Sequence, residues 1–270
     1  MTVSANTENR LNATDEALSA VGPLSPQTAG DLFAIADLIA DSTQLRRTLT
    51  DPTLSVTARQ QIIVRLLQGK VDPAAQTVAS HCVAQPWPSG RGLVEAIDRQ
   101  GVRAVLLTAE RAGRLDEVEA TLFRVGRIVE GNRALRAALG DRVVPLPRRQ
   151  ALVRSLLQGK VPAETIALAE RAVAASHRTF DLTVEHYLGI CAALRRRTIA
   201  TVRVARPLTA QQQARLQAAL IQQAGRPVTL LVTVDPNLIG GVRVDMGDQL
   251  IDGSIASRLH NATRRLTAHP

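Results

Sequence analysis

Residues 234–259 read VDPNLIGGVRVDMGDQLIDGSIASRL, and this stretch decides the fold of the C-terminal part of the chain. Val242 to Met246 alternates apolar and polar residues, which is the pattern of a half-buried β-strand. Gly247-Asp248 suits a tight turn, after which Gln249 to Ile251 returns as the second strand of a hairpin. Ser254 is placed to cap a following helix. The stretch therefore predicts a β-hairpin that leads into a helix.

The same stretch resembles the C-terminal signature of the delta subunit of F-type ATP synthases, a family that includes the mitochondrial oligomycin-sensitivity-conferring protein. The matching residues, in chain order, are Leu238, Ile239, Gly240, Gly241, Gly247, Asp248, Ile251, Asp252, Gly253, Ser254 and Leu259. We assign them to fold geometry before partner contact, because glycine permits a positive φ or a close approach of two backbones. The resemblance extends back to about residue 100.

The residues just before the signature predict a small α+β domain. Thr198 to Val204 alternates as a strand, and Pro227 to Val234 reads as another. Between them, Thr209 begins a capping-box pattern before a helix that runs to Ala224. The predicted order from residue 198 is strand, helix, strand, hairpin strands and helix.

An internal repeat organises the part of the chain that precedes this domain. The hexamer LLQGKV occurs at 66–71 and again at 156–161, an offset of 90 residues. At this offset 16 of 52 positions are identical between 32–83 and 122–173. A match of this length indicates duplication of a whole helical module, because solenoid repeats are shorter. We therefore predict a mainly α fold, with a duplicated helical-bundle module followed by the small α+β C-terminal domain.

Three domains follow from the repeat and from a Pro-rich break at 85–90: a first helical module (1–90), a second helical module (91–197) and the C-terminal domain (198–270). Before the first copy of the repeat only a short helix near residues 15–20 is expected. The run from Val105 to Leu115 is similar to the first helix and turn of the family's N-terminal bundle. The second module is thus the family's standard one, and the first is an extra copy. The extended form resembles delta subunits of high-GC Gram-positive bacteria.

The charge of the chain is strongly basic but spread out. The net charge is +9, and aromatic residues make up only 2%. Residues 1–90 carry 6 basic and 8 acidic groups (net −2), 91–197 carry 19 and 12 (net +7), and 198–270 carry 8 and 4 (net +4). The sequence has no basic tail, and it has few aromatic rings on which bases could stack. Both features argue against nucleic-acid binding. A basic helical adaptor or nucleic-acid-binding protein remains the alternative function.

No pattern in the sequence predicts catalysis, a cofactor or a metal. The five histidines have no fixed spacing to Cys or Asp residues, and Gly240-Gly241 lacks the frame of a phosphate-binding loop. Cys82 and Cys191 stand alone, and we expect reduced, buried thiols in a cytosolic compartment. No run of 18 apolar residues and no signal-peptide pattern is found. The sequence thus predicts an adaptor without an active site.

The resemblance makes this adaptor role concrete. It implies a non-catalytic peripheral-stalk subunit of a proton-translocating F-type ATP synthase, which links the catalytic head to the membrane-sector stator and resists rotor torque. The implied partners are the N-terminal segments of the alpha subunits and the C-terminal region of the b subunit, with no nucleic acid expected. The implied location is the cell membrane, peripheral and on the cytoplasmic side, with membrane contact only through the complex.

The resemblance also places a groove for the alpha segments between the helix at 102–112 and the helix at 163–175. Docking of a helix into a groove uses apolar anchors at i, i+3, i+4 and i+7 spacing, which both helices offer. The candidate anchors are Val102, Val105, Leu106, Ala109, Ile166 and Ala169. Each is equally compatible with an internal core position. The charges of the two copies further predict that the second copy contacts the head, and that the first contacts the stalk or another subunit.

Overall fold

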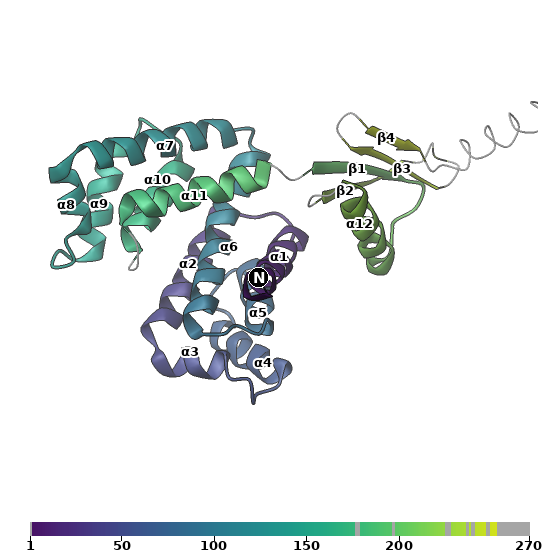
Figure 1. The fold of residues 1–270 in the computed structure, drawn as a ribbon, viewed down its shortest axis with the longest axis horizontal. Helices are drawn as coiled ribbons and strands as arrows, with labels where there is room; N and C mark the ends of the chain where they lie inside the picture. Colours follow the sequence, from purple (N-terminus) through teal and green to yellow (C-terminus); the bar gives the residue numbers. More distant parts are fainter. Residues whose placement is uncertain are drawn as a thin grey trace, which may run out of the picture. The chain divides into compact units, whose positions relative to one another are not determined.

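The computed structural model describes residues 2–175, 179–195, 198–224, 228–235, 238, 241–246 and 249–252. The chain divides into two compact units, Met1–Cys191 and Ala192–Pro270, which are treated one at a time below. In the described residues the first unit is helical, and the second contains a sheet and the helix α12 (Figure 1). The predicted fold class, mainly α with a small α+β C-terminal part, is confirmed.

The helices of the first unit follow one another through short turns. In chain order they are α1 (Thr2–Ala20), α2 (Pro26–Asp41), α3 (Thr43–Leu49), α4 (Val56–Leu67), α5 (Pro73–Ala84), α6 (Gly90–Arg111), α7 (Leu115–Gly131), α8 (Arg133–Gly140), α9 (Leu146–Leu157), α10 (Ala163–Ala174) and α11 (Phe180–Arg195). Local chemistry sets several ends. For example, Ser25 caps α2 by a capping box with Thr28, and Gly69 follows α4 with φ 70°.

The two copies of the repeat form the same hydrogen bonds 90 residues apart. Arg59 Nη1 on α4 donates to the carbonyl oxygens of Leu49 and Val83 at 3.5 and 3.1 Å. Arg149 Nη1 on α9 donates to the two equivalent carbonyl oxygens at 3.0 and 3.3 Å. The last carbonyl groups of a helix find no N–H donor within that helix. In each copy one guanidinium therefore donates to such carbonyl groups at the ends of two other helices. These shared contacts show that the repeat in sequence is a repeat in structure.

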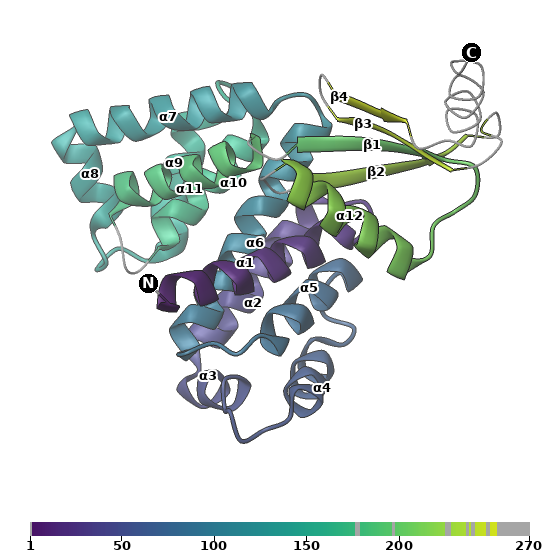
Figure 2. The same cartoon turned by 45° about the vertical axis from the view of Figure 1, so that its right-hand side comes forward.

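Helix α6 belongs to both copies. Shifting by 90 residues aligns α1 with α6 and α6 with α11, so α6 is the last helix of the first copy and the first helix of the second. It packs along α2 and α5, and it also contacts α7 and α10 (Figures 1 and 2). All side chains from Gln100 to Leu106 are buried, on every face of the helix. The division into 1–90, 91–197 and 198–270 stays a prediction, but the helix that begins at residue 90 is common to both helical modules.

A buried polar cluster fixes α1 on α6. An Asp15 carboxylate oxygen lies 2.9 Å from Arg103 Nε, and the other lies 3.0 Å from Arg99 Nη2. Gln100 Nε2 donates to Thr14 and Asp15 at 3.0 and 2.9 Å. The side chains of Asp15 and Arg103 are 2% and 0% exposed. Because a buried charge that loses its partner is strongly destabilising, these contacts set the register of α1 on α6.

The second unit contains β1 (Thr198–Val204), α12 (Ala210–Ala224), β2 (Val228–Val234), β3 (Val242–Met246) and β4 (Gln249–Asp252). The strand order is β2-β1-β3-β4; β1 and β2 are parallel and connected through α12, and the other neighbours are antiparallel. The predicted hairpin is therefore present as β3 and β4. Thr209 and Gln212 form the predicted capping box at the start of α12. The predicted helix after Ser254 lies outside the described residues.

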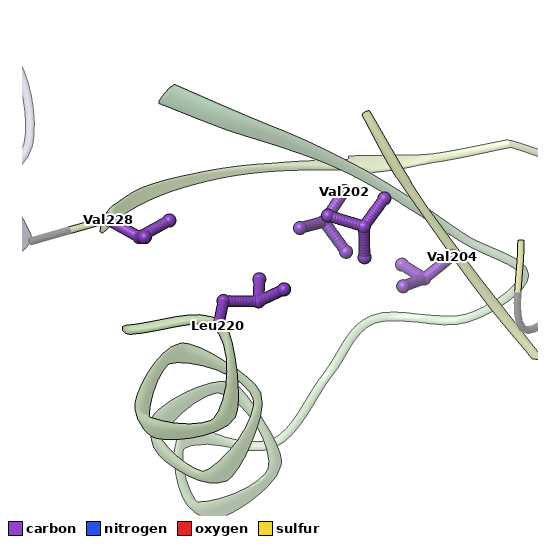
Figure 3. Packing of buried hydrophobic residues seen from close by; sticks show 5 residues of the cluster. Val202, Val204, Leu220 and Val228 are labelled. Carbon is purple, nitrogen blue, oxygen red and sulfur yellow. The ribbon is translucent and has the colours of Figure 1, made fainter. Parts of the chain in front are cut away.

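The core of this unit lies between the sheet and α12. Val202, Val204 and Val228 point from the strands toward Leu220 on the helix (Figure 3), and Val244 on β3 belongs to the same buried cluster. All five side chains are at most 4% exposed. The alternating residues of β1 thus place one face of the sheet under the helix, as the period of two requires.

The close approach of α2 and α6 depends on a glycine. A Cβ atom at Gly101 would lie 2.5 Å from Cε1 of Phe33, whereas a Cβ at Gly30, also on α2, would meet no atom within 4 Å. We expect Gly101→Ala to lower the free energy of unfolding by roughly 1–3 kcal/mol, because the two helices must move apart. As the control, Gly30→Ala should raise it by about 0.5–1 kcal/mol through helix propensity.

Urea unfolding followed by circular dichroism measures both changes. A Gly101→Ala protein as stable as the wild type would show that α2 and α6 are not in close contact at this position.

Candidate partner-binding surfaces

The predicted groove residues lie on α6 and α10, which contact each other. Five of the six candidates are buried within the chain itself. On α6 these are Val102, Val105, Leu106 and Ala109, and on α10 Ala169, all at most 6% exposed. Ile166 on α10 is partly exposed. Their role in partner binding stays a prediction, and in the structure of the chain alone they fill the contact between the helices of the bundle.

Arg171 on α10 lies beside this region and joins the two copies. Its Nη1 is 2.8 Å from Asp37 Oδ2 on α2, and its Nε is 2.5 Å from Asp98 Oδ1 on α6. The guanidinium carbon lies 4.9 Å from the centre of the Phe33 ring, a cation–π contact. The Arg171 side chain is only 12% exposed. One cation therefore ties the second copy to the first through two carboxylates and an aromatic face.

Burial and charge act against each other at this ion pair. Burial raises the pKa of Asp98, and the nearby positive charge and hydrogen bond of Arg171 only partly oppose this rise. Burial also acts to lower the pKa of Arg171, but its hydrogen bonds and charge contacts with Asp37 and Asp98 outweigh burial and raise it. The carboxylate of Asp98 is thus a desolvated charge that depends on Arg171.

Loss of Arg171 is predicted to expose this dependence. Arg171→Met should lower the free energy of unfolding by roughly 1–3 kcal/mol, because the partly buried carboxylate of Asp98 loses its cation. Adding Asp98→Asn should recover part of the loss, with a coupling energy of about 1 kcal/mol or more in a double-mutant cycle. Arg111→Met, at an exposed arginine of α6, is the control and should change stability little. If the stability changes of Arg171→Met and Asp98→Asn simply add in the double variant, the two side chains do not form a direct ion pair.

The C-terminal signature has a structural explanation where the structure describes it. Gly241 has φ 91°, a left-handed conformation that favours glycine. Ile251 and Asp252 form part of β4, opposite Val244 and Arg243 of β3. Leu238 N donates to the carbonyl of Asp235 in the turn before β3. The remaining signature residues lie outside the described ranges: Ile239, Gly240, Gly247, Asp248, Gly253, Ser254 and Leu259.

The described part of the chain offers little for catalysis. No three His, Cys, Asp or Glu side chains among its residues form a group that could hold a metal ion. Cys82 and Cys191 are free and buried, and burial, with the nearby charge of Asp15, raises the pKa of the Cys82 thiol. A protonated thiol shielded from solvent is a poor nucleophile. The absence of an active site, a cofactor and a metal stays a prediction for the whole chain.

None of the helices described by the structure combines the length and the apolar character needed to cross a bilayer.

One surface feature was missed by the sequence analysis. A hollow of about 450 Å³ lies between α7, α8 and α9, in the second copy. Three of its lining residues are valines at positions where the first copy has isoleucine. This difference between the copies is the signal in the sequence that could have revealed it.

Comparison with known proteins places the chain in a family. Residues 97–266 match the family model of the ATP synthase delta (OSCP) subunit. This match begins inside α6, so it spans the second helical copy and the C-terminal unit, whereas the first copy precedes it.

Full-length relatives extend the comparison to the first copy. A protein of Kineococcus radiotolerans named ATP synthase subunit delta is 43% identical over 253 residues, 93% of this chain and 92% of its own. Proteins of the same name from Nocardia farcinica (38% identical; 93% of each chain) and Streptomyces avermitilis (40% identical; 90% and 89%) align similarly. These relatives, like most of those found, are actinobacterial, which confirms the predicted resemblance to the extended form.

A structural match is weaker. A chain in a cryo-EM structure of the Toxoplasma gondii mitochondrial ATP synthase hexamer covers 63% of this chain and 96% of its own, with 21% identity and a TM-score of 0.28. This similarity is too low to carry an argument. The family match and the full-length relatives are sufficient without it: the chain belongs to the ATP synthase delta (OSCP) subunit family.

Proposed function

We propose that this chain is a non-catalytic peripheral-stalk subunit of a proton-translocating F-type ATP synthase. The observation that carries the proposal is the match to the delta (OSCP) family over residues 97–266, together with relatives named ATP synthase subunit delta along nearly the whole chain. In this role the chain links the catalytic head to the membrane-sector stator and resists rotor torque. It performs no chemistry of its own, and it reaches the cytoplasmic side of the cell membrane only through the complex.

The helical unit has the construction that such a link requires. A subunit that holds the head against torque must transmit force between two ends without yielding in the middle. Here the common helix α6 runs from one copy into the other, and Arg171 adds ion pairs across the same contact. A closely packed interior deforms little, so load applied to one copy is passed to the other.

The partners of the proposed subunit are the N-terminal segments of the alpha subunits and the C-terminal region of the b subunit. The difference in net charge between the copies, −2 against +7, supports different partners for each. We assign the head to the second copy, and the stalk or another subunit to the first. The α6–α10 face of the second copy is the proposed site for an alpha segment, and Ile166 is its accessible apolar residue.

The proposed function is tested by measuring how ATP hydrolysis is coupled to proton uptake in membrane vesicles. Inside-out vesicles stripped of this chain should keep ATP hydrolysis by the head but lose ATP-driven proton uptake, and added purified chain should restore the uptake. Failure of the purified chain to restore coupling would contradict the stalk role. Retention of nucleic acid by the chain, with affinity that falls steeply with salt, would favour the basic nucleic-acid-binding alternative instead.

A substitution at Ile166 tests the docking face. Ile166→Asp should weaken binding of a synthetic alpha N-terminal peptide by roughly tenfold or more, because it places a charge among the apolar contacts of the groove. Ala151→Asp, at an exposed position of α9, is the matched control and should bind as the wild type does. Titration by fluorescence anisotropy measures both affinities. Equal affinities for the two variants would move the site away from the α6–α10 face.

A further inference from the structure

Two adjoining hollows form a groove on the second copy, away from the α6–α10 face. The first, of about 450 Å³, lies between α7, α8 and α9. The second, of about 390 Å³, lies between α8, α10 and the start of α11. Leu139 and Phe180 line both. We call the two hollows together the second-copy groove.

The two copies differ in side-chain size at three of the positions that line the first hollow. Three lining positions are valine in the second copy and isoleucine in the first: Val125, Val129 and Val153 against Ile35, Ile39 and Ile63. The isoleucines are at most 1% exposed, whereas the valines are 3–7% exposed. Each valine lacks one methylene, and an unfilled apolar space usually costs stability. Isoleucine at these positions would narrow the first hollow, so the valines of the second copy leave more apolar space there.

A fourth lining position also differs between the copies, but here the larger residue is in the second copy. A Cβ atom at Gly90 would lie 2.7 Å from Cβ of Arg46, so in the first copy α6 begins directly against α3. At the equivalent position of the second copy Phe180 begins α11, and its ring lines both hollows. The aromatic side chain occupies the place where the first copy has direct contact between two helices. Phe180 therefore forms part of the wall that the two hollows share.

The groove offers apolar surface to solvent. Ile128 and Leu156 line the first hollow and are 60% and 41% exposed. Large apolar side chains that remain exposed together on a soluble protein mark a site of interaction. Most residues that line the first hollow are aliphatic, and most of these lie on α7 and α9, which suits the apolar face of an amphipathic helix.

The charges around the groove select the occupant. Every charged residue that lines the two hollows is a cation: Arg124 and Lys160 in the first, and Arg136, Arg142 and Arg149 in the second. No carboxylate is present among these lining residues. A segment with an apolar stripe and flanking Asp or Glu side chains would match both the walls and the rim.

We propose that the second-copy groove docks an acidic, amphipathic helical segment of a partner protein. The apolar side chains of this segment enter the hollow between α7 and α9, and its carboxylates meet the cations of the rim. This surface is distinct from the α6–α10 face, and the proposal does not depend on the stalk function. It concerns the second copy, which has valine at three lining positions where the first copy has isoleucine.

Selection from random peptides tests the proposal without assuming a partner. Displayed peptides of about 16 residues, roughly four helical turns, are selected on the full chain. We expect enriched sequences that are net acidic, with apolar residues at i, i+3, i+4 and i+7. Their affinities are then measured with synthetic copies by fluorescence anisotropy. An unenriched pool, or one that is net basic, would overturn the proposal.

Two variants locate the binding site. Val125→Ile/Val129→Ile/Val153→Ile gives the second copy the isoleucines of the first, and it should weaken binding by roughly tenfold or more while the fold is kept. Arg124→Glu/Lys160→Glu should weaken binding at least as much. As the control, Arg65→Glu/Lys70→Glu makes the same charge change at exposed residues of the first copy. Measured at the same ionic strength, its affinity for the peptides should stay within about twofold of the wild-type value.

The outcomes are decisive in both directions. Peptides that bind the isoleucine variant as tightly as the wild type would overturn the proposal. Should that variant prove unstable in urea, the charge-reversal pair and its first-copy control decide the matter on their own. Vesicles of phosphatidylglycerol that sediment the wild type but not the charge-reversal variant, with no acidic peptide enriched, would assign the cations to a lipid surface instead.

Discussion

The burial of α6 on all sides is the constraint on which the helical unit depends. A surface helix needs only one apolar stripe, but α6 contacts α1, α2, α3 and α5 of the first copy and also α7 and α10 of the second. From Gln100 to Leu106 it has no solvent face left. Each copy has five helices of its own, α1–α5 or α7–α11, and α6 serves as the sixth helix of both. Neither copy can therefore bury its core in this arrangement without α6.

Polar contacts determine how α6 is held. In the middle part of α6, Asp15 of α1 meets Arg99 and Arg103, and Asp98 meets Arg171 of α10. Buried ion pairs are weak evidence for added stability, since desolvation offsets their attraction, but they penalise any other register strongly. For a subunit proposed to bear load, a single defined arrangement of the two copies matters more than the depth of the free-energy minimum.

Much of the fold could be predicted from local chemistry. Alternation predicted β1 and β3, and the pattern at Thr209 predicted the capping box at the start of α12. The repeat was visible because the hexamer LLQGKV ends a helix in both copies. The length of α1 was not predictable, since its buried face includes Thr14 and Asp15, and apolar periodicity does not register polar residues.

The site was harder to predict for a related reason. An apolar residue at helical spacing looks the same whether it faces a partner or another helix of its own chain, so most groove candidates proved to be buried within the bundle. The sharing of α6 also had no signal in a repeat search, because a shared helix appears once. The sequence signal of the second-copy groove is visible only when the copies are compared position by position, because three lining residues differ from their counterparts by a single methylene.

Native-state hydrogen exchange of the full chain, read segment by segment by mass spectrometry, tests the central claim that α6 joins both copies into one structure. The account predicts that amides of α5, α6 and α10 exchange with a common free energy of opening, within about 1 kcal/mol, because loss of either copy exposes α6. Full protection of α5 while α10 and the second half of α6 open together at much lower free energy would contradict it. The copies would then be separate bundles that merely adjoin.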